Sequence, residues 1–426
     1  MVAGNAFCRA GLTAMMLALA TGACRTNVRP AALPAESRAD EQTPALLSGP
    51  YVIDVTATAA TVCWQTGDER AGEIRAGTVG GETVCTIMRR QPARFHAERL
   101  TGLVAATTYH VEVRDDSEAL GELTFGTAPE EADAFTFFAY GDTRTHSDDH
   151  AAVAAAIEAE AQRRKQVTFL LHTGDFAASG SDAEETAEQF FRPAAALLAR
   201  MPLVPVRGNH ENGTALYRKY FPPQPSGSRG FEGDDRCIDY GSVRIVVLDK
   251  YAPPETLPAR LKWLADRLAE AQDRWRIVSF HEPIYSSGKH RSATRFRAAV
   301  EPVLVAGKVH AVLAGHDHNY ERTRPIKGIT HFTAGGGGAP LREESSRGLG
   351  EWSAMFASRH HFLAIAVTAE RMLVQAHGRV GRTDRFEVFD SVEIPRACAW
   401  PDPEPPAPDL TFLRIVEPSA RGLRNV

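Results

Sequence analysis

The stretch VHAVLAGHDH, Val309–His318, joins an apolar, strand-like run to two histidines and an aspartate. A single histidine after a strand is better explained as a hydrogen-bonded residue at the edge of a core. Two histidines two positions apart in turning backbone can both reach one side of the chain, where each offers a nitrogen to a cation. The stretch therefore suggests a metal site whose remaining ligands lie elsewhere in the sequence.

Other apolar runs end in the same way. They lead into Gly141-Asp142, Gly174-Asp175, Gly208-Asn209-His210-Glu211 and, after IVSF, His281. Side chains that follow the strands of open α/β folds meet at one edge of the sheet. Together with the first stretch, these strand ends predict one shared site rather than five unrelated loops.

Helical spacing separates these strands, so the region from residue 133 to residue 393 is predicted to be an α/β domain. Helices are expected at about Asp148–Arg164, Ala183–Arg200 and Arg295–Val305, and near Leu257, where leucines recur on one face. Ser147 resembles a helix cap. His146 and His150, which lie close to that cap, are expected at the surface.

The segment 47–128 has a different pattern, with short β-type runs between Gly, Asp and Pro turns and no helical period. This pattern predicts a small β-sandwich domain ahead of the α/β domain. Residues 25–46 are predicted to be a flexible linker, and residues 394–426 a proline-rich C-terminal tail.

With 426 residues, 43% of them hydrophobic and 24% charged, the chain can bury a large core and form two domains. A net charge of -5 offers no basic surface for nucleic acid. After residue 24 no run reaches the roughly 18 apolar residues that a membrane helix needs. We therefore expect a globular protein without nucleic-acid partners, apart from a possible nucleotide substrate.

The first 24 residues place Arg9 before an apolar run and the small residues TGAC, which is the order of a secretory signal peptide. Two outcomes stay open: lipidation of Cys24, as in bacterial lipoproteins, and plain cleavage nearby. The predicted location is outside the cytoplasm, as a periplasmic, lipid-anchored or secreted bacterial protein. Membrane contact is expected only through a lipid on Cys24.

Export leaves four cysteines, an even number that is typical of disulfides in an oxidising compartment. Of three possible connectivities, Cys63–Cys85 with Cys237–Cys398 is preferred, because Cys63 and Cys85 lie in one small region. The alternative is four free thiols.

The ordered set of strand-end residues resembles the calcineurin-like metallophosphoesterases and, among them, the purple acid phosphatases, whose motifs are DxG, GDxxY, GNH(D/E), VxxH and GHxH. The resemblance covers most of residues 47–390 and includes Tyr320-Glu321-Arg322 and the glycine-rich TAGGGG near Gly335. It implies a two-sheet αββα sandwich behind a fibronectin type III-like domain. It also implies two metal ions at the strand ends.

Carried over by position, the resemblance assigns Asp142 and His318 to the first metal and Asp175 to both, with Asn209, His281 and His316 on the second. Mixed oxygen and imidazole ligands suit Mn, Fe or Zn better than Ca or Mg. Two such ions about 3.5–4 Å apart would clamp a phosphate and turn a bound water into a hydroxide nucleophile. Their surplus positive charge favours a small, dianionic phosphate ester as substrate.

The resemblance also assigns substrate contacts. His210 would contact phosphate and protonate the leaving oxygen, with a structural histidine as the alternative. His290, in HEPIYSSGKH, would face the substrate or else be a solvated loop residue. Arg291 replaces the second histidine that follows His290 in the family.

Two motifs depart from the family. In GDTR, Arg144 stands where a ligand or glycine is expected, and a guanidinium has no lone pair for a metal. It would bind substrate phosphate as a fork, the favoured role, or form a structural ion pair. In GDFAAS, Ala178 replaces the tyrosine that colours purple acid phosphatases, so we predict no purple absorption band and a weaker first metal site.

Two further features are interpreted more simply. His172, on an alternating strand, is expected to be buried and bonded to a neighbour. The glycines from Gly335 would either cradle phosphate or form a tight turn that needs positive φ.

The predicted function is hydrolysis of phosphate monoesters by an acid phosphatase-like enzyme with two transition-metal ions. A phosphodiesterase that acts on nucleotides or other diesters is the first alternative, because the same metal set serves both reactions. The second is a catalytically impaired protein that binds phosphate.

Overall fold

The structure is a computed structural model that describes residues 46–115, 118–131, 134–164, 167–211, 213, 215–224 and 234–401, all within the compact unit Pro44–Val426. The predicted signal peptide, Cys24, the linker before residue 46 and the tail after residue 401 lie outside these residues. Among the described helices, none has the length and apolar character that crossing a membrane requires.

The N-terminal region is entirely β. Its strands are β1 (Leu46–Ile53), β2 (Ala59–Thr78), β3 (Thr83–Thr101), β4 (Thr108–Arg114) and β5 (Ala119–Gly126). All pairs among them are antiparallel. In β4 the buried residues alternate, so Tyr109, Val111 and Val113 face a separate hydrophobic core. The predicted all-β region ahead of the α/β domain is confirmed.

Two mixed sheets form the rest. The first sheet has the order β18-β17-β16-β6-β7-β8 and continues into β1 through the parallel pair Ile53 and Leu203. Its strands are β6 (Ala134–Tyr140), β7 (Val167–His172), β8 (Leu203–Pro205), β16 (His361–Thr368), β17 (Arg371–Arg379) and β18 (Phe386–Pro395).

The second sheet has the order β15-β13-β14-β12-β11-β10-β9. Its strands are β9 (Arg236–Tyr240), β10 (Val243–Val247), β11 (Trp275–Ser279), β12 (Ala311–Ala314), β13 (Tyr320–Thr323), β14 (Thr330–Ala334) and β15 (Ser353–Ala357). Strands β10, β11 and β12 run parallel, as do β6, β7 and β8 in the first sheet.

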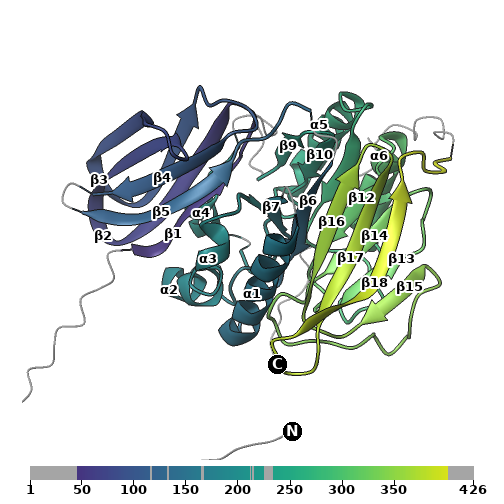
Figure 1. Ribbon diagram of the computed structural model, residues 1–426. Coiled ribbons are helices and arrows are strands. Elements are labelled where there is room, and N and C mark those ends of the chain that lie inside the picture. The colour runs from purple at the N-terminus through teal and green to yellow at the C-terminus, as the bar shows by residue number, and fades with distance from the viewer. Residues whose placement is uncertain are drawn as a thin grey trace, which may run out of the picture. The chain divides into compact units, whose positions relative to one another are not determined.

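Helices cover the outer face of each sheet. Those on the first sheet are α1 (Ser147–Arg163), α2 (Ala183–Thr186), the π-helix η1 (Ala187–Phe191), α3 (Ala195–Leu198) and α4 (Leu216–Tyr220). Those on the second are the 3₁₀ turn η2 (Pro254–Thr256), α5 (Leu257–Ala269) and α6 (Thr294–Ala306). Figure 1 shows the sheets facing each other between α1 and the pair α5 and α6.

Alternation along the strands builds these layers. On β6, Phe137 packs into the cluster between the sheets, whereas Phe138 packs into the cluster under α1. On β10, Ile245 faces the inter-sheet cluster and Val246 faces α5. Because side chains alternate faces along a strand, each central strand supplies two cores. The predicted αββα sandwich is confirmed.

Local expectations fail at two places. The single helix expected at Ala183–Arg200 is instead the three short pieces α2, η1 and α3. Pro193 has no N–H to continue an α-helical ladder. Just before it, the backbone N–H of Arg192 donates to the carbonyl of Ala187, five residues back, which is the π-helical hydrogen bond. At α1 the cap position is held by His146 without a side-chain hydrogen bond, so Ser147 is the first helical residue and not the cap.

The predicted disulfides are wrong. All four cysteines in the described residues are free. Cys63 pairs with Ala97 and Cys85 with Ala76, so they lie far apart along the β2–β3 ladder, about 40 Å for a straight strand. Disulfide-linked Cα atoms lie at most about 7 Å apart. Cys237 and Cys398 pack against different hydrophobic clusters.

Candidate metal centre

The carboxyl ends of parallel strands bring the predicted ligands together. Asp142 follows β6, Asp175 follows β7 and Asn209 follows β8, while His281 follows β11 and the pair His316 and His318 follows β12. Contacts cross between the two sheets, since the backbone N–H of His316 donates to Asp142 Oδ2 at 2.9 Å. The site therefore lies where the strand ends of both sheets meet.

Unusual backbone geometry marks these strand ends. Asp142, Asp175 and His316 have φ of 58°, 58° and 69°, the left-handed region that costs a non-glycine residue roughly 1 kcal/mol or more. Each follows a glycine. A Cβ on Gly174 would lie 2.5 Å from His281 Nδ1, so this glycine is required for the loop to pack against the histidine. Such strain is typical of functional sites.

Four side-chain donors converge on one point. Asp175, His281 and His316 place ligand atoms within 4.8 Å of one another, and Asn209 Oδ1 lies 3.1 Å from His281 Nε2 and 2.8 Å from His316 Nδ1. His281 Nδ1 lies 2.7 Å from the Thr173 carbonyl, so it carries the proton and leaves the Nε2 lone pair facing the site. Two imidazoles, an amide oxygen and a carboxylate fit one divalent transition-metal ion.

Charge coupling ties His281 to Asp175. His281 Nε2 lies 3.3 Å from Asp175 Oδ1, and both side chains are buried. Burial disfavours the charged imidazolium and so lowers the pKa of His281. The attraction of the Asp175 carboxylate is stronger than this effect and raises the pKa of His281 to about 10. Burial likewise opposes the charged form of Asp175, yet His281 holds its pKa below the usual range. A metal ion would therefore displace a proton from this pair.

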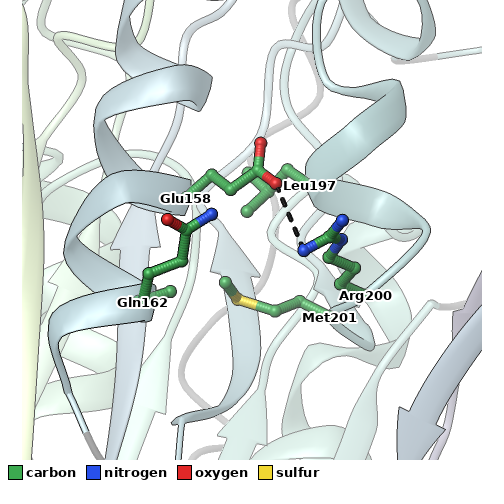
Figure 2. Close-up of a pocket in the computed structure, with 6 residues that line it drawn as sticks. Glu158, Gln162, Leu197, Arg200 and Met201 are labelled. Atoms are coloured by element: carbon green, nitrogen blue, oxygen red, sulfur yellow. Dashed lines mark ion pairs between the residues drawn. The ribbon is translucent and has the colours of Figure 1, made fainter.

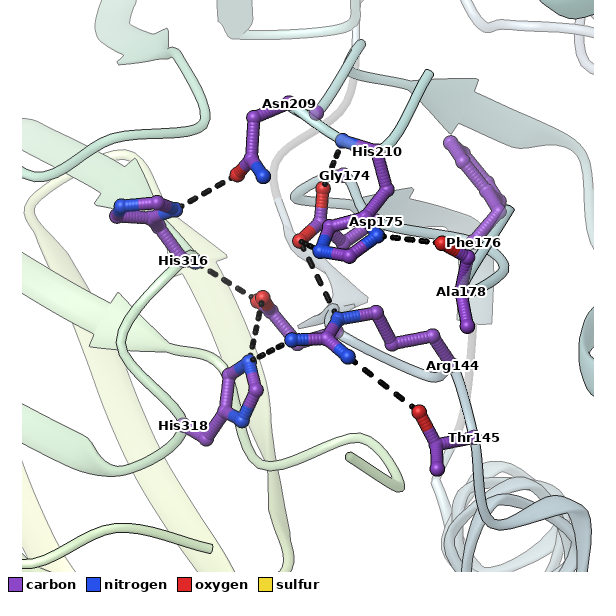
Figure 3. Close-up of polar contacts among 12 residues, drawn as sticks. Arg144, Thr145, Gly174, Asp175, Phe176, Ala178, Asn209, His210, His316 and His318 are labelled. Atoms are coloured by element: carbon purple, nitrogen blue, oxygen red, sulfur yellow. Dashed lines mark hydrogen bonds and ion pairs between the residues drawn. The ribbon is translucent and has the colours of Figure 1, made fainter. Parts of the chain in front are cut away.

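The predicted first metal site is occupied by protein. His318 Nε2 lies 3.7 Å from Asp142 Oδ1, but Arg144 Nη2 lies only 3.2 Å from the same His318 nitrogen. Arg144 Nε is 3.6 Å from Asp175 Oδ2, so Arg144 makes the ion pair that was the alternative to a phosphate fork. Figure 3 shows its guanidinium between Asp175 and His318. These residues do not fit a metal ion as they stand.

His210 and His290 reach the site from its edges. His210 Nδ1 donates to the Ala178 carbonyl at 2.7 Å, and its Nε2 lies 3.7 Å from Asp175 Oδ2, so Nε2 faces the centre. The exposed ring of His290 lies 4.4 Å from the His316 ring and accepts a 2.7 Å hydrogen bond from Arg342 Nη1. His290 is thus solvent-exposed and also held beside a candidate ligand.

Sequence reasoning missed three residues that shape the site. Glu211 accepts from the backbone N–H groups of Asp175, Phe176 and Gly208 at 3.1, 2.9 and 2.9 Å. Burial, followed by the neighbouring Asp175, raises the pKa of Glu211 to about 7. The sequence feature that could have identified Glu211 is its position in GNHE, directly after Asn209 and His210.

The other two are Asp317 and Arg342. Asp317 accepts from Ser286 Oγ and from the N–H of His290, so it anchors the loop that carries His290. The sequence feature that could have identified Asp317 is its position between the two histidines of GHDH. Arg342 had no motif signal, because only the folded chain brings it to His290.

Of the three other histidines whose burial was predicted, two are placed as expected and one is not. His172 is buried and contacts Thr143 Oγ1 at 3.2 Å, and His146 is exposed, as expected. His150 is not at the surface: it is fully buried between Tyr140 and the Gln189 carbonyl. The reason is that α1 turns this face toward the first sheet.

The glycine-rich run is not the turn with positive φ that was one of its two predicted roles. None of residues 335–338 has positive φ. The N–H groups of Gly337 and Ala339 donate to the carbonyls of Gly141 and Asp142 at 2.8 Å each, so they pair with the GDTR loop instead of pointing at phosphate. A Cβ on Gly335 would lie 2.2 Å from the Asp317 carbonyl, which explains the absence of a side chain there.

A second cavity, away from the strand ends, contains none of the candidate metal ligands. A cavity of about 180 Å³ lies between α1 and the end of α3, lined by Glu158, Gln162, Leu197, Arg200 and Met201 among others (Figure 2). Its one ion pair joins Arg200 to Glu158 at 3.7 Å. The lining contains no histidine and no strand-end residue, so the cavity is separate from the metal centre.

Parts of the chain are similar to known phosphoesterases. The family model of calcineurin-like phosphoesterase matches residues 135–320. Purple acid phosphatase 1 of Ipomoea batatas is 28% identical over 165 residues, 35% of each chain. The Fe(3+)-Zn(2+) purple acid phosphatase 12 of Arabidopsis thaliana is 32% identical over 114 residues, 26% of this chain and 24% of that protein. The matched segments thus span only 35% and 24% of these relatives' own length.

The fold has solved counterparts. A purple acid phosphatase from yellow lupin (Lupinus luteus) seeds superposes with a TM-score of 0.69 at 18% identity, covering 81% of this chain and 74% of that one. At this identity the likeness concerns the fold alone. The fold and the strand-end site resemble those of calcineurin-like metallophosphoesterases, whose family model matches residues 135–320. The relatives that this part of the chain matches include purple acid phosphatases, at low identity.

Proposed function

We propose that this metallophosphoesterase hydrolyses phosphate monoesters, as an acid phosphatase-like enzyme. The observation that carries the proposal is the convergence of Asp175, Asn209, His281 and His316 beside the partly buried His210. The names of its relatives, purple acid phosphatases, support the same reaction class.

The donor set indicates which metal to expect. Two imidazoles with two oxygen donors suit Mn, Fe or Zn, and one relative is named for iron and zinc. When bound, such an ion supplies a Lewis acid for phosphate and for an attacking water. Asp175, Asn209, His281 and His316 would hold it.

The surrounding side chains supply proton transfer and charge. Because His210 Nδ1 donates to the Ala178 carbonyl, Nε2 faces the centre, and the imidazolium form of His210 can pass its Nε2 proton to a leaving oxygen. Arg144 places a permanent positive charge beside the buried Asp175 carboxylate, and Arg342 places a second one beside His290 at the edge of the site. Together with a divalent ion they exceed the charge of Asp142 and Asp175, which favours a dianionic monoester over a monoanionic diester.

The test uses the full chain, stripped of metal and reloaded with Mn, Fe or Zn. We expect nitrophenyl phosphate to be hydrolysed with a higher kcat/KM than bis(nitrophenyl) phosphate. Asp175→Asn should lower kcat at least about 100-fold, because it removes the anionic ligand at the centre. The matched control is Asp266→Asn on the exposed face of α5, which should leave kcat unchanged.

Other outcomes would identify the alternatives. Faster hydrolysis of the diester would make the chain a phosphodiesterase. Failure to hydrolyse either ester with any of the three metals, while inorganic phosphate still binds, would make it a phosphate-binding protein. Full activity of Asp175→Asn would refute the site itself.

A further inference from the structure

Arg144 lies among the three residues that the family resemblance assigns to the first metal ion. Its Nη2 is 3.2 Å from His318 Nε2 and its Nε is 3.6 Å from Asp175 Oδ2. Only 14% of its side chain is exposed, so the guanidinium is held inside the site and not in solvent. Figure 3 shows this placement.

The contact with His318 uses the lone pair that a metal would need. His318 Nδ1 lies 2.8 Å from the Pro340 carbonyl and therefore carries the ring proton, which leaves Nε2 as the acceptor. A guanidinium can only donate hydrogen bonds, so Arg144 donates to Nε2. A single lone pair cannot bind Arg144 and a metal ion at once.

The buried carboxylates also need a nearby cation. Asp142 and Asp175 are 0% and 1% exposed, and buried charges are stable only when they are paired. A guanidinium is charged at every ordinary pH, whereas a metal ion must be captured from solution. A divalent ion placed within a few Å of that guanidinium would in addition be repelled by it.

We propose that the Arg144 guanidinium takes the place of the first metal ion. The centre then binds a single divalent ion, through Asp175, Asn209, His281 and His316. This inference rests on the proposed function but concerns the composition of its site. It sets this chain apart from the two-ion arrangement that the family implies.

One observation favours the rival arrangement. Asp142 Oδ1 is buried and has no hydrogen-bond partner among the described residues. A second ion would contact this oxygen if Arg144 swung away. Counting the ions bound per chain separates the two arrangements without any measurement of activity.

The experiment measures bound Mn²⁺ per chain by elemental analysis after metal loading and gel filtration. We expect one ion in the wild type and two in Arg144→His, which frees His318 Nε2 and adds an imidazole ligand. Two Mn²⁺ ions about 3.5–4 Å apart couple magnetically, so the EPR spectrum of Arg144→His should change with the count. Arg342→His is the matched control and should keep one ion.

A second pair of variants covers the case in which Arg144→His does not fold. His318→Ala should keep one ion per chain, whereas His281→Ala should lose it. Two ions in the wild type, or loss of an ion in His318→Ala, would overturn this inference and leave the proposed hydrolysis intact. Absence of any ion in the wild type would overturn both.

Discussion

At the scale of single residues, Glu211 holds two of the loops that carry candidate ligands. Its carboxylate accepts the N–H groups of Asp175 and Phe176 after β7 and of Gly208 after β8. The loops are in close contact, since a Cβ on Gly208 would lie 2.1 Å from Asp175 Oδ1. Asp175 therefore owes its position to an acidic residue that is not expected to touch the metal.

Glu211→Gln should weaken this arrangement. A glutamine amide turns an N–H group toward backbone donors, and each buried donor left without an acceptor costs about 1–3 kcal/mol. We expect a loss of that order in the free energy of urea unfolding, together with weaker metal binding. Glu188→Gln, on the exposed surface of η1, is the control. Equal stability of the two variants would contradict the role of Glu211.

At the scale of elements, α1 is joined to the first sheet through a buried histidine. His150 Nε2 lies 3.1 Å from the Tyr140 hydroxyl on β6, and Nδ1 lies 2.8 Å from the Gln189 carbonyl. Burial lowers the pKa of His150 to about 4 from an ordinary value of 6.5. The contact between α1 and the sheet is thus made by a neutral imidazole.

This contact should make stability depend on pH. The unfolded chain binds a proton at His150 near pH 6.5 and the folded chain only near pH 4, so acid favours unfolding. The stabilisation is complete above about pH 6.5 and declines as the pH falls toward about 4. His150→Gln should reduce the stability difference between pH 7 and pH 5 by about 2 kcal/mol.

Urea unfolding at both pH values measures this difference. His146→Gln is the matched control, because it removes an imidazole near the start of the same helix whose side chain is 50% exposed. If His150→Gln and the wild type lost the same free energy between pH 7 and pH 5, His150 would not be the buried neutral group described above.

At the scale of the whole molecule, a buried ion pair joins the N-terminal strands to the second sheet. Arg236 on β9 donates through Nη1 to both oxygens of Asp54, at 2.7 and 2.8 Å, and through Nη2 to the carbonyls of Phe221 and Pro222. Arg236 is fully buried. The N-terminal β region is therefore part of the same structural unit as the metal centre's sheets.

Arg236→Met should destabilise the whole unit by about 3–5 kcal/mol, because it leaves the buried Asp54 carboxylate without its partner. The double variant Asp54→Leu with Arg236→Met should recover part of that loss. Arg371→Met removes an exposed pair with Glu393 and should cost about 0–1 kcal/mol. Thermal unfolding monitored by circular dichroism compares the variants, and a neutral Arg236→Met would rule out this coupling.

Local sequence patterns predicted most of the strands, three of the helices and the residues that follow the strands. Alternation predicted the strands, helical spacing predicted α1, α5 and α6, and the glycine–ligand pairs predicted the strand-end site. These signals are local, because a residue's face and its place after a strand depend on its immediate neighbours. The αββα layers followed from them together with the family resemblance.

Which side chains lie in contact could be learned only from the folded chain. It separated Cys63 from Cys85 along one ladder and buried His150. It also placed Arg144 against His318, 174 positions away in sequence. Such pairings depend on how strands and loops pack against one another, and no local pattern encodes the distance between two loops. The number of ions at the centre depends on that packing.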